Sequence, residues 1–417
     1  MKPPLTRGSE PLSVLYVVYW GAAEPLGQSL VLPTIERLAG NGIRVTLMTF
    51  EKITDLRCMR DIGLIELRLR ERGVAWIRLR YHKWPRVPAT LWDIVQGCWW
   101  GLVSRVRHRY DLVHARTFVG GLIGLVLAPV LGAKLVFHAE GFYSEEQVDS
   151  GVWRAGSVPH RLGTALERLM YGRADADIVL SARARDVVSR LPAVARHKTP
   201  ILVVPSCVDL DRFSEREGHR PEPSVSLRLV YMGSVGRRYR VEPIARLTRA
   251  AATAGPVFLT ILSWAVRDEV APALAEAGLA GEDWCLKAVP HAAVPAELRQ
   301  HDAGLHFIEA GRGGPGGSPT KIGEYWAAGL PAVVNAGVGD TEDIIRRHRV
   351  GVIVEGDSEQ ALSAAAKDLR LLVQDAALRN RCRWAAEEYY SLAKACEAQL
   401  ALYRSLLLPP SATAVGN

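Results

Sequence analysis

The stretch SPTKIGEYWAAGLPAVVNAGVGDTEDII, residues 318–345, combines a helix start with a short apolar strand. Ser318 and Thr320 are natural N-cap residues, and Pro319 suits a first helical turn. The small residues that follow predict a short helix, and AVVN (332–335) predicts a buried strand. In an open α/β sheet, the N–H groups and dipole of such a helix start form an anion site where phosphates bind.

Two charged side chains stand at the mouth of this predicted helix. Lys321 adds a positive charge beside the anion site, and Glu324 lies one turn deeper on nearly the same face. Because a carboxylate repels phosphate, Glu324 needs another role, and its two oxygens suit the two hydroxyls of a ribose. An ordinary capping box with a surface ion pair is the structural alternative.

The segment EAGRGGPGGS (309–318), just upstream, contains five glycines. Glycines allow the backbone to approach a ligand closely. A flexible lid has the same composition, so this segment alone does not distinguish the two interpretations.

Strand and helix patterns alternate along the chain, which predicts doubly wound parallel sheets. The strands expected in the first half are 13–20, 43–50, 74–80, 111–116, 134–140, 176–182 and 201–206. After PSCVDLDRF (205–213) and a polar, Pro-rich segment, strand patterns resume at 227–234, 257–263, 285–289, 303–309, 332–335 and 350–355. The sequence therefore predicts two domains in tandem, followed by a helical tail.

The apolar run FVGGLIGLVLAPVLGAKLVF, residues 118–137, has the composition of a transmembrane span. Pro129, Gly132 and Lys134 interrupt it, so a buried helix followed by a buried strand explains it better. Six scattered cysteines without a CxxC pair indicate reduced thiols and no zinc site. The first residues lack the apolar core of a signal peptide, so we expect a cytoplasmic protein.

The positive charge is concentrated in the first half. Residues 1–205 contain 28 Lys and Arg against 18 Asp and Glu, whereas residues 206–417 contain 24 against 26. Residues 57–116 alone contain 13 basic and 5 acidic residues, together with Trp76, Trp84, Trp92, Trp99 and Trp100. Basic residues interleaved with Trp are typical of a face that binds an anionic membrane surface or an anionic acceptor. A basic face over a Trp-rich core is the alternative, and no motif supports a nucleic-acid partner.

The order PSCVDLDRF, VYMGSVGRRY, SPTKIGEYWAAGLPAVVNAGVGDTEDII and VGVIV resembles the retaining glycosyltransferases of family 4, which have the GT-B fold. The resemblance covers nearly the whole chain and is closest to a bacterial subgroup with an SPTKxGEY-type donor helix. It implies two Rossmann-like domains that face each other across a cleft. Residues 1–205 would bind the acceptor, residues 206–384 the nucleotide-sugar, and a C-terminal helix at 385–408 would cross back to the first domain.

The resemblance also implies the reaction. A sugar would pass from a nucleotide-diphospho-sugar to a glycan or lipid-linked acceptor, with retention of configuration, in the synthesis of cell-surface polysaccharide or glycoconjugates. Arg, Lys and a helix N-terminus can neutralise the departing diphosphate, and no DxD-like acidic pair appears in the loop where the family would need one. We therefore expect no metal and no other cofactor. Peripheral association with the inner face of the cell membrane is a further hypothesis.

Site residues follow from the same resemblance. Glu324 matches the second Glu of the family's E-x7-E motif and would hold the ribose, whereas Gly316 stands in place of the first Glu, which normally contacts the sugar. The remaining donor-side candidates are Gly27, Gly233, Ser234, Arg238, Gly317, Ser318, Thr320 and Lys321. Arg237 and Lys321 are also candidates for stabilising the leaving diphosphate, because they are cations near its expected position.

The first domain supplies the remaining candidates. His138 matches the family's cleft histidine, and Glu140 lies two residues on, hence on the same side of the strand. This pair would orient the acceptor hydroxyl or take its proton, although a buried structural histidine is the alternative. Gln28, His114 and Arg116 are expected on the acceptor side.

Two other functions remain open at this stage. A nucleotide-sugar epimerase would need acids and histidines gathered around the sugar carbon, and this chain offers few. A non-catalytic GT-B partner protein would explain the glycine at position 316.

Overall fold

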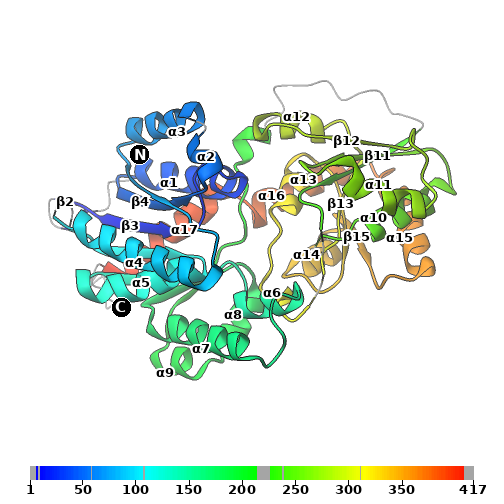
Figure 1. Cartoon of the computed structure of the whole chain (residues 1–417). Coiled ribbons are helices and arrows are strands. Elements are labelled where there is room, and N and C mark those ends of the chain that lie inside the picture. The colour runs from blue at the N-terminus through cyan, green and yellow to red at the C-terminus, as the bar shows by residue number, and fades with distance from the viewer. Residues whose placement is uncertain are drawn as a thin grey trace, which may run out of the picture. The chain divides into compact units, whose positions relative to one another are not determined.

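The computed structural model describes residues 6–7, 10–57, 59–106, 109–213, 226–236, 239–309 and 311–407. The chain forms two compact units, which Figure 1 shows coloured by position in the sequence. Unit 1 contains Met1–Ser144, Arg161–Val204 and Leu392–Asn417. Unit 2 contains Glu145–His160 and Pro205–Ser391.

Unit 1 is built on a parallel sheet of seven strands in the order β5-β4-β3-β6-β7-β8-β9. The central strand β3 reads SVLYVV and is buried at every position, as expected for a parallel strand covered on both faces. The strands are β3 (Ser13–Val18), β4 (Arg44–Glu51), β5 (Ala75–Arg80), β6 (Leu112–Arg116), β7 (Lys134–His138), β8 (Ala176–Val179) and β9 (Ile201–Val203). A separate short antiparallel pair comprises β1 (Thr6–Arg7) and β2 (Glu10–Pro11).

Helices cover this sheet, and their apolar faces form its core. They are η1 (Gly27–Val31), α1 (Leu32–Gly40), α2 (Ile53–Arg57), α3 (Met59–Glu71), α4 (Arg86–Ser104), α5 (Phe118–Leu131), α7 (Val158–Arg173), α8 (Ala182–Val188) and α9 (Pro192–His197). Most of helix α6 (Tyr143–Asp149) and the first residues of α7 are grouped with unit 2.

The apolar run at residues 118–137 forms helix α5 and strand β7, both largely buried. Thr117 caps α5 by accepting the Gly120 N–H, and Gly132 ends it in the left-handed conformation. The expectation of a buried helix followed by a buried strand is confirmed. Within the described ranges, no helix has both the length and the apolar character that a membrane span requires.

Unit 2 is built on a parallel sheet of six strands in the order β12-β11-β10-β13-β14-β15. The strands are β10 (Leu227–Met232), β11 (Val257–Leu262), β12 (Trp284–Lys287), β13 (Ala303–His306), β14 (Ala332–Asn335) and β15 (Gly351–Val354). The helices and turns are η2 (Leu210–Phe213), α10 (Glu242–Ala252), α11 (Arg267–Glu276), η3 (His291–Ala293), α12 (Val294–Leu298), η4 (Gly314–Gly316), α13 (Thr320–Ala327), α14 (Thr341–His348), α15 (Glu359–Leu372) and α16 (Leu378–Tyr389). Separate apolar clusters line the two faces of the sheet.

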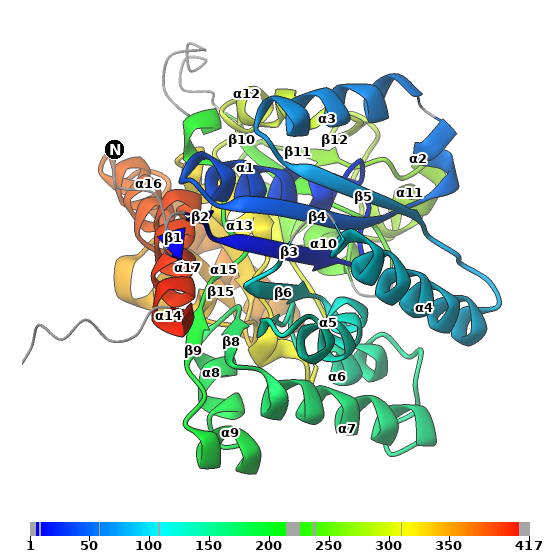
Figure 2. The ribbon, with the colours of Figure 1, turned by 90° about the vertical axis from the view of Figure 1, so that its left-hand side faces the viewer.

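The helical tail is two helices rather than one. After α16, which packs on α13 in unit 2, the chain continues as α17 (Leu392–Leu407). Helix α17 packs against α1 and β9, and its residues belong to unit 1 (Figure 2). The expected return of the C-terminal helix to the first unit is therefore confirmed, although residues 385–391 group with unit 2.

Each sheet has one place where the order of strand addition reverses. In unit 1 this place lies between β3 and β6, and in unit 2 it lies between β10 and β13. The loops at the carboxyl ends of such neighbouring strands diverge and leave room for a ligand. These two edges position the residues described next.

Candidate active site

Helix α13 packs on β13, which borders the reversal point of the unit 2 sheet. Pro319 occupies the N-cap position and makes no side-chain capping bond. The expectation that Ser318 and Thr320 act as N-caps is therefore wrong. Thr320 is the first helical residue, and the Ser318 Oγ accepts the Ser206 N–H at 3.2 Å. No side-chain cap therefore covers the start of α13; the Ile322 N–H donates to the Pro319 carbonyl at 3.1 Å, and the N–H groups of Thr320 and Lys321 suit an anion.

Lys321 lies against the loop that follows β10. A Cβ atom at Gly233 would lie 3.1 Å from the Lys321 Cε, and Gly233 has φ +145°, which L side chains rarely adopt. The Lys321 ammonium lies 5.2 Å from the centre of the Tyr239 ring. The neighbouring Ser234 carbonyl accepts the Tyr231 hydroxyl at 2.5 Å. The structure brings Gly233, Ser234 and Lys321 to one sheet edge, and their donor-binding role stays a prediction.

Glu324 is buried one turn into α13, with 6 % of its surface exposed. Burial raises the pKa of its carboxyl to about 7, while the charges of Arg212 and Lys321 act in the opposite direction. The His291 Nε2 lies 3.9 Å from the Glu324 Oε1. A buried carboxyl of this kind differs from the surface ion pair of the alternative interpretation.

Arg212 and His291, beside Glu324, are residues that sequence analysis missed. The Arg212 Nη1 lies 2.9 Å from the His291 Nε2, and its Nη2 donates to the His291 carbonyl at 2.5 Å. Arg212 is the one basic residue of PSCVDLDRF, which was a usable signal. His291, in the turn η3, has no comparable signal in its local sequence.

The glycine-rich loop before α13 is held by carboxylates of the segment Glu145–His160. The N–H groups of Arg312 and Gly313 donate to Asp149 at 3.0 and 2.8 Å. The Arg312 guanidinium pairs with Glu145 at 3.0 Å. The loop therefore follows a defined course and directs backbone N–H groups at a carboxylate.

The last glycines of this loop form the turn η4. Gly316, in the position of the missing first Glu, is buried within it. The Gly317 N–H donates to the Gly314 carbonyl at 3.0 Å. Gly316 and Gly317 thus bring backbone rather than side chains to the start of α13.

The arginines predicted after β10 are only partly placed. Arg237 and Arg238 lie outside the described residues. Arg240, their neighbour, pairs with Asp357 at 2.6 Å and lies 3.7 Å from Glu309. Its charge is therefore partly used by these carboxylates.

The loop after β3 in unit 1 is built around Gly27. A Cβ atom there would lie 2.1 Å from the Gly21 carbonyl oxygen, so only glycine fits. The Gln28 side-chain amide donates to the Ala23 carbonyl at 3.2 Å, and the buried Glu51 accepts the Ala22 N–H at 2.7 Å. The donor contact of Gly27 and the acceptor contact of Gln28 stay predictions.

Four predicted residues of unit 1 form one cluster at the carboxyl ends of β6 and β7. Arg116 pairs with Glu140 and also donates to the Tyr16 hydroxyl at 3.4 Å. The His138 Nε2 lies 3.8 Å from the Glu140 Oε1. The His114 Nε2 lies 3.1 Å from the His138 Nδ1. Strand register explains the grouping, because Arg116 and His138 are direct partners in the ladder.

The two histidines of this cluster are buried, which favours the neutral form of both imidazoles. Burial lowers the pKa of both imidazoles well below the usual value, and the nearby Arg116 charge lowers it further. Tyr403, from helix α17, places its hydroxyl 2.6 Å from the His114 Nδ1. Tyr16 stacks on the His114 ring with centroids 4.2 Å apart. Sequence analysis identified neither tyrosine.

Thr117, directly after this strand, has φ 73°, an unusual conformation for a β-branched residue. Its N–H donates to the His138 carbonyl at 3.1 Å, and its hydroxyl caps α5. These bonds hold a strained backbone next to Arg116, as is common at functional sites.

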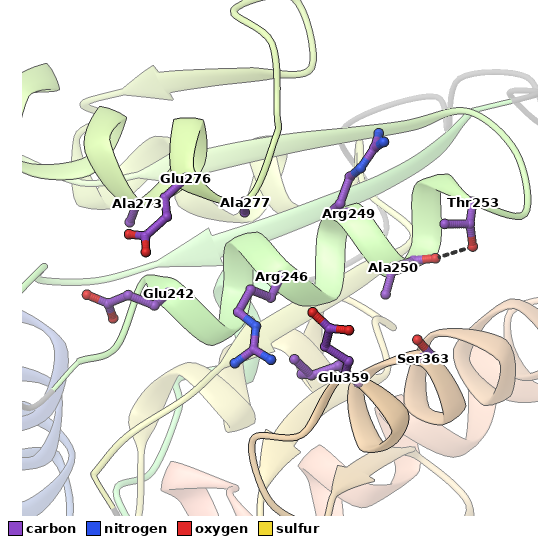
Figure 3. Close-up of a pocket in the computed structure, with 11 residues that line it drawn as sticks. Glu242, Arg246, Arg249, Ala250, Thr253, Ala273, Glu276, Ala277, Glu359 and Ser363 are labelled. Carbon is purple, nitrogen blue, oxygen red and sulfur yellow. Dashed lines mark hydrogen bonds between the residues drawn. The ribbon is translucent and has the colours of Figure 1, made fainter.

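A cavity of about 510 Å³ lies elsewhere in unit 2, between α10, α11 and α15 (Figure 3). Its charged lining residues are Glu242, Arg246, Arg249, Glu276 and Glu359. None of the predicted site residues lines it, so it is separate from the α13 site.

Metal-binding groups are not evident in the part of the chain that the structure describes. There, no group of three or more His, Cys, Asp or Glu side chains could hold a metal ion. Metal independence stays a prediction. The cysteines described there form no disulfide: Cys98, Cys207, Cys285, Cys382 and Cys396.

Comparisons with known proteins agree with this architecture. Residues 28–212 match the family model Glycosyltransferase Family 4. Sucrose-phosphate synthase from Thermosynechococcus elongatus is similar in structure, with a TM-score of 0.70 and 14 % identity over 95 % of this chain and 99 % of that one. A glycosyltransferase from Rickettsia africae gives 0.68 and 13 %, over 96 % and 99 %.

HepE from Anabaena, solved with UDP and glucose, gives a TM-score of 0.66 and 14 % identity, over 94 % of this chain and 100 % of that one. No curated protein matches the sequence. The shared architecture defines the fold: the chain has the two-domain GT-B fold of glycosyltransferases, and residues 28–212 match the Glycosyltransferase Family 4 model. The expected fold class is thereby confirmed.

Proposed function

We propose that the chain transfers a sugar from a nucleotide-diphospho-sugar to a glycan or lipid-linked acceptor, with retention of configuration and without a metal ion. One observation carries this proposal. Gly233, Lys321 and the start of α13 lie together at the reversal point of the unit 2 sheet, and Glu324 is buried one helical turn further into α13. HepE, of similar fold, has been solved with UDP and with UDP-glucose, which supports a donor of this class.

Each group at this site has a part in donor binding. The N–H groups of Ser318 and Thr320, with the backbone of Gly317 beside them, suit the diphosphate, and Lys321 adds a full positive charge. Glu324 accepts both hydroxyls of the ribose. Because its carboxyl is buried, these two donors would replace the water that the carboxylate loses on folding.

The chemistry is a substitution at the anomeric carbon of the sugar. The bond from this carbon to the diphosphate oxygen breaks, and a bond to the acceptor oxygen forms. The proton of the acceptor hydroxyl passes to the departing diphosphate. Negative charge grows on the diphosphate as the bond breaks, so Lys321, Arg237 and the α13 start stabilise the transition state more than the ground state.

Unit 1 supplies the acceptor side in this proposal. His138, Glu140, His114 and Arg116 form a connected polar cluster at the reversal point of its sheet. The hydroxyl of a sugar or of a lipid-linked acceptor binds there. Gln28, which follows Gly27 in the loop after β3, contacts the same acceptor. We further propose that the enzyme acts at the inner face of the cell membrane. Its product would serve the synthesis of cell-surface polysaccharide or glycoconjugates. The epimerase and the non-catalytic partner are not favoured by the family match.

A thermal-shift panel with UDP, GDP, ADP, TDP and CDP tests donor binding. A ligand at about a hundred times its dissociation constant stabilises by roughly 2.7 kcal/mol, which is readily measured. We expect one diphosphate to raise the melting temperature, Glu324→Ala to abolish the shift, and the matched variant Glu359→Ala, at the separate cavity, to keep it. No shift with any diphosphate would contradict the proposal.

Turnover with the nucleotide-sugar of the same base tests metal independence and retention of configuration. We expect the activity to survive an excess of EDTA and the product to keep the anomeric configuration of the donor. Loss of activity in EDTA, restored by one divalent metal, would overturn metal independence while leaving the donor site intact.

A further inference from the structure

Helix α4 presents its small side chains to the protein and its large apolar side chains to solvent. Its buried positions recur every four residues, at Ala89, Asp93, Gly97 and Gly101. The large apolar residues exposed on α4 and its flanks are Trp84, Val87, Leu91, Trp92, Val95, Trp99, Trp100, Leu102, Val103 and Val106. At 100° per residue most of them fill roughly 160° of the helix, opposite the buried stripe. This arrangement is the reverse of an ordinary surface helix.

Packing fixes which face is exposed. Helix α4 lies against α5 (Figure 2), and Cβ atoms at Gly97 and Gly101 would lie 2.7 and 2.5 Å from methyl groups of Ile123 and Leu127. The buried Asp93 accepts the Tyr19 hydroxyl at 2.7 Å. Because the helix approaches α5 through glycines, rotating its tryptophans inward would require α4 to move away from the sheet.

The charges around this face have one sign. Lys83 and Arg86 are exposed at the start of α4, and Arg105 is exposed at its end. Asp93 is the one acidic residue within 83–106, and it is buried. Within residues 83–106, the exposed apolar face is therefore accompanied by exposed positive charges and by no exposed acidic side chain.

The tryptophans themselves distinguish between the two interpretations of this region. Trp84 is 83 % exposed and Trp99 is 63 % exposed, with Trp92 and Trp100 about half exposed. Only Trp76 is partly enclosed, where its indole N–H donates to Thr49 at 2.8 Å. The alternative of a basic face over a Trp-rich core is thus wrong for four of the five tryptophans.

We propose that α4 lies in the interface of an anionic lipid bilayer, with its axis in the membrane plane. The apolar arc enters the acyl boundary, the indoles occupy the headgroup level, and Lys83, Arg86 and Arg105 contact acidic lipids. The charge favours lipid over a second copy of the chain, because two copies would bring like charges together. This proposal does not depend on sugar transfer.

Co-sedimentation of the full chain with vesicles tests it, with no donor or acceptor present. We expect binding to phosphatidylcholine vesicles that contain phosphatidylglycerol, and little binding to pure phosphatidylcholine. Trp92→Ser with Trp99→Ser should weaken binding on the order of 100-fold. Lys83→Ala with Arg86→Ala should weaken it roughly 30-fold.

Matched variants in unit 2 serve as controls. Trp264→Ser removes another exposed tryptophan, and Arg347→Ala with Lys367→Ala removes the same charge; both should leave vesicle binding unchanged. Equal loss with these controls, or no binding to acidic vesicles, would overturn the proposal. So would a concentration-dependent dimer that Trp92→Ser with Trp99→Ser abolishes.

A second inference concerns the cluster at His138 and rests on different contacts. A neutral imidazole has one N–H donor and one acceptor nitrogen. Among the described residues, the Tyr403 hydroxyl has one hydrogen-bond partner, the His114 Nδ1. A buried phenolic proton without an acceptor is costly, and we therefore assign this hydroxyl as the donor to His114. The His114 Nε2 must then carry the proton and donate to the His138 Nδ1. The remaining proton of His138 consequently lies on its Nε2.

We infer that Tyr403 is a positioning residue that presents His138 to the substrate as an N–H donor. The His138 Nε2 is buried and without a hydrogen-bond partner among the described residues, and it faces the Glu140 carboxylate at 3.8 Å. An N–H at this nitrogen is attracted to the Glu140 carboxylate, whereas a nitrogen lone pair would be repelled by it. His138 therefore binds an oxygen of the substrate and does not take the acceptor proton. This role in the reaction rests on the proposed function; the tautomer itself does not.

Two-bond ¹H–¹⁵N correlation spectra of the full chain, labelled at histidine, read the tautomers directly. We expect both rings protonated at Nε2 at neutral pH, assigned with His114→Asn and His138→Asn. Protonation of His138 at Nδ1 would overturn the inference, whether or not the chain is active.

Tyr403→Phe removes the hydroxyl and keeps the ring. We expect mixed tautomers at His114 and His138, and a kcat about tenfold lower with KM unchanged, as for a lost transition-state hydrogen bond. The control Tyr110→Phe removes another buried hydroxyl of unit 1, bonded to Ser104, and should change neither readout. Unchanged tautomers in Tyr403→Phe would contradict the positioning role.

Discussion

The polar cluster of unit 1 and the α13 site of unit 2 occupy the same place in their sheets but are built differently. In unit 1, buried side chains from three strands and the last helix bond mainly to one another. In unit 2, a helix start and glycine loops supply backbone groups, with Lys321 and Glu324 from one short stretch. Substitutions in the unit 1 cluster should therefore lower stability as well as activity, whereas substitutions at the α13 site should lower activity with little loss of stability. The following experiments test that difference.

Arg116→Ala should have the largest effect on stability. The change leaves the Glu140 carboxylate and the Tyr16 hydroxyl without a largely buried cation, which costs about 3–5 kcal/mol. Urea unfolding followed by circular dichroism measures the loss, and Glu140→Gln in the same chain should restore part of it. A loss below about 1 kcal/mol would show that the cluster does not support unit 1.

Lys321→Ala should affect catalysis and leave stability nearly unchanged. Loss of one positive group at the departing diphosphate should lower kcat by about 10²–10³-fold. The Lys321 side chain is partly exposed, its ammonium contacts an aromatic ring, and it forms no ion pair with another described residue, so the melting temperature should move little. Lys367→Ala, an exposed lysine on α15, is the control for the change in charge. If the melting temperature fell as far as in Arg116→Ala, the contrast between the two sites would be lost.

Glu324→Gln should stabilise the ligand-free chain at neutral and higher pH. The folded-state pKa of about 7 lies above the ordinary value of 4.5, so the unfolded chain releases this proton first as the pH rises. Below pH 4.5 the Glu324 carboxyl is protonated in both states and does not lower the free energy of unfolding. As the pH rises through 7, burial of the carboxyl lowers this free energy by up to about 3 kcal/mol. The side chain of Gln does not ionise, so the variant shows no such loss of stability with pH.

Urea unfolding of both proteins from pH 5 to 8 measures this difference. The curves should converge at the acidic end and separate with rising pH. A constant difference across the range would mean that Glu324 is already ionised in the folded chain throughout.

Ser318→Ala should have the smallest effect. The change removes the acceptor of the buried Ser206 N–H and should destabilise unit 2 by about 1 kcal/mol. The second consequence is on donor binding, measured by titration with the nucleoside diphosphate that shifts the melting temperature in the thermal-shift panel. A tenfold loss of affinity would show that the Ser318 hydroxyl binds the donor, and unchanged affinity would leave only its N–H for that role.

Local sequence predicted the parts of these sites that are continuous or in register. Lys321 and Glu324 lie within one helix, and His114, Arg116, His138 and Glu140 follow from adjacent parallel strands. Tyr403 could not be found in this way, because it lies 289 residues from His114 and reaches it only through the return of α17. Ser318 was misassigned as a cap because a tertiary contact, the Ser206 N–H, takes its hydroxyl.

The α4 face shows a different limit. Its spacing of apolar residues predicts a helix, but spacing alone assigns the larger side chains to the core. The decisive information lies in Gly97 and Gly101, which permit close contact with Ile123 and Leu127. Only the position of α5 shows that small residues form the buried stripe.

The return of α17 to unit 1 has a consequence for biosynthesis. Proteins are made from the N-terminus, and domains ordinarily fold in that order as they leave the ribosome. Here the main segment of unit 2, Pro205–Ser391, is synthesised before Leu392–Leu407, which unit 1 needs to cover α1 and β9. The unit that begins the chain is thus the last to complete its core, and it spends most of translation with an uncovered face that a chaperone could bind.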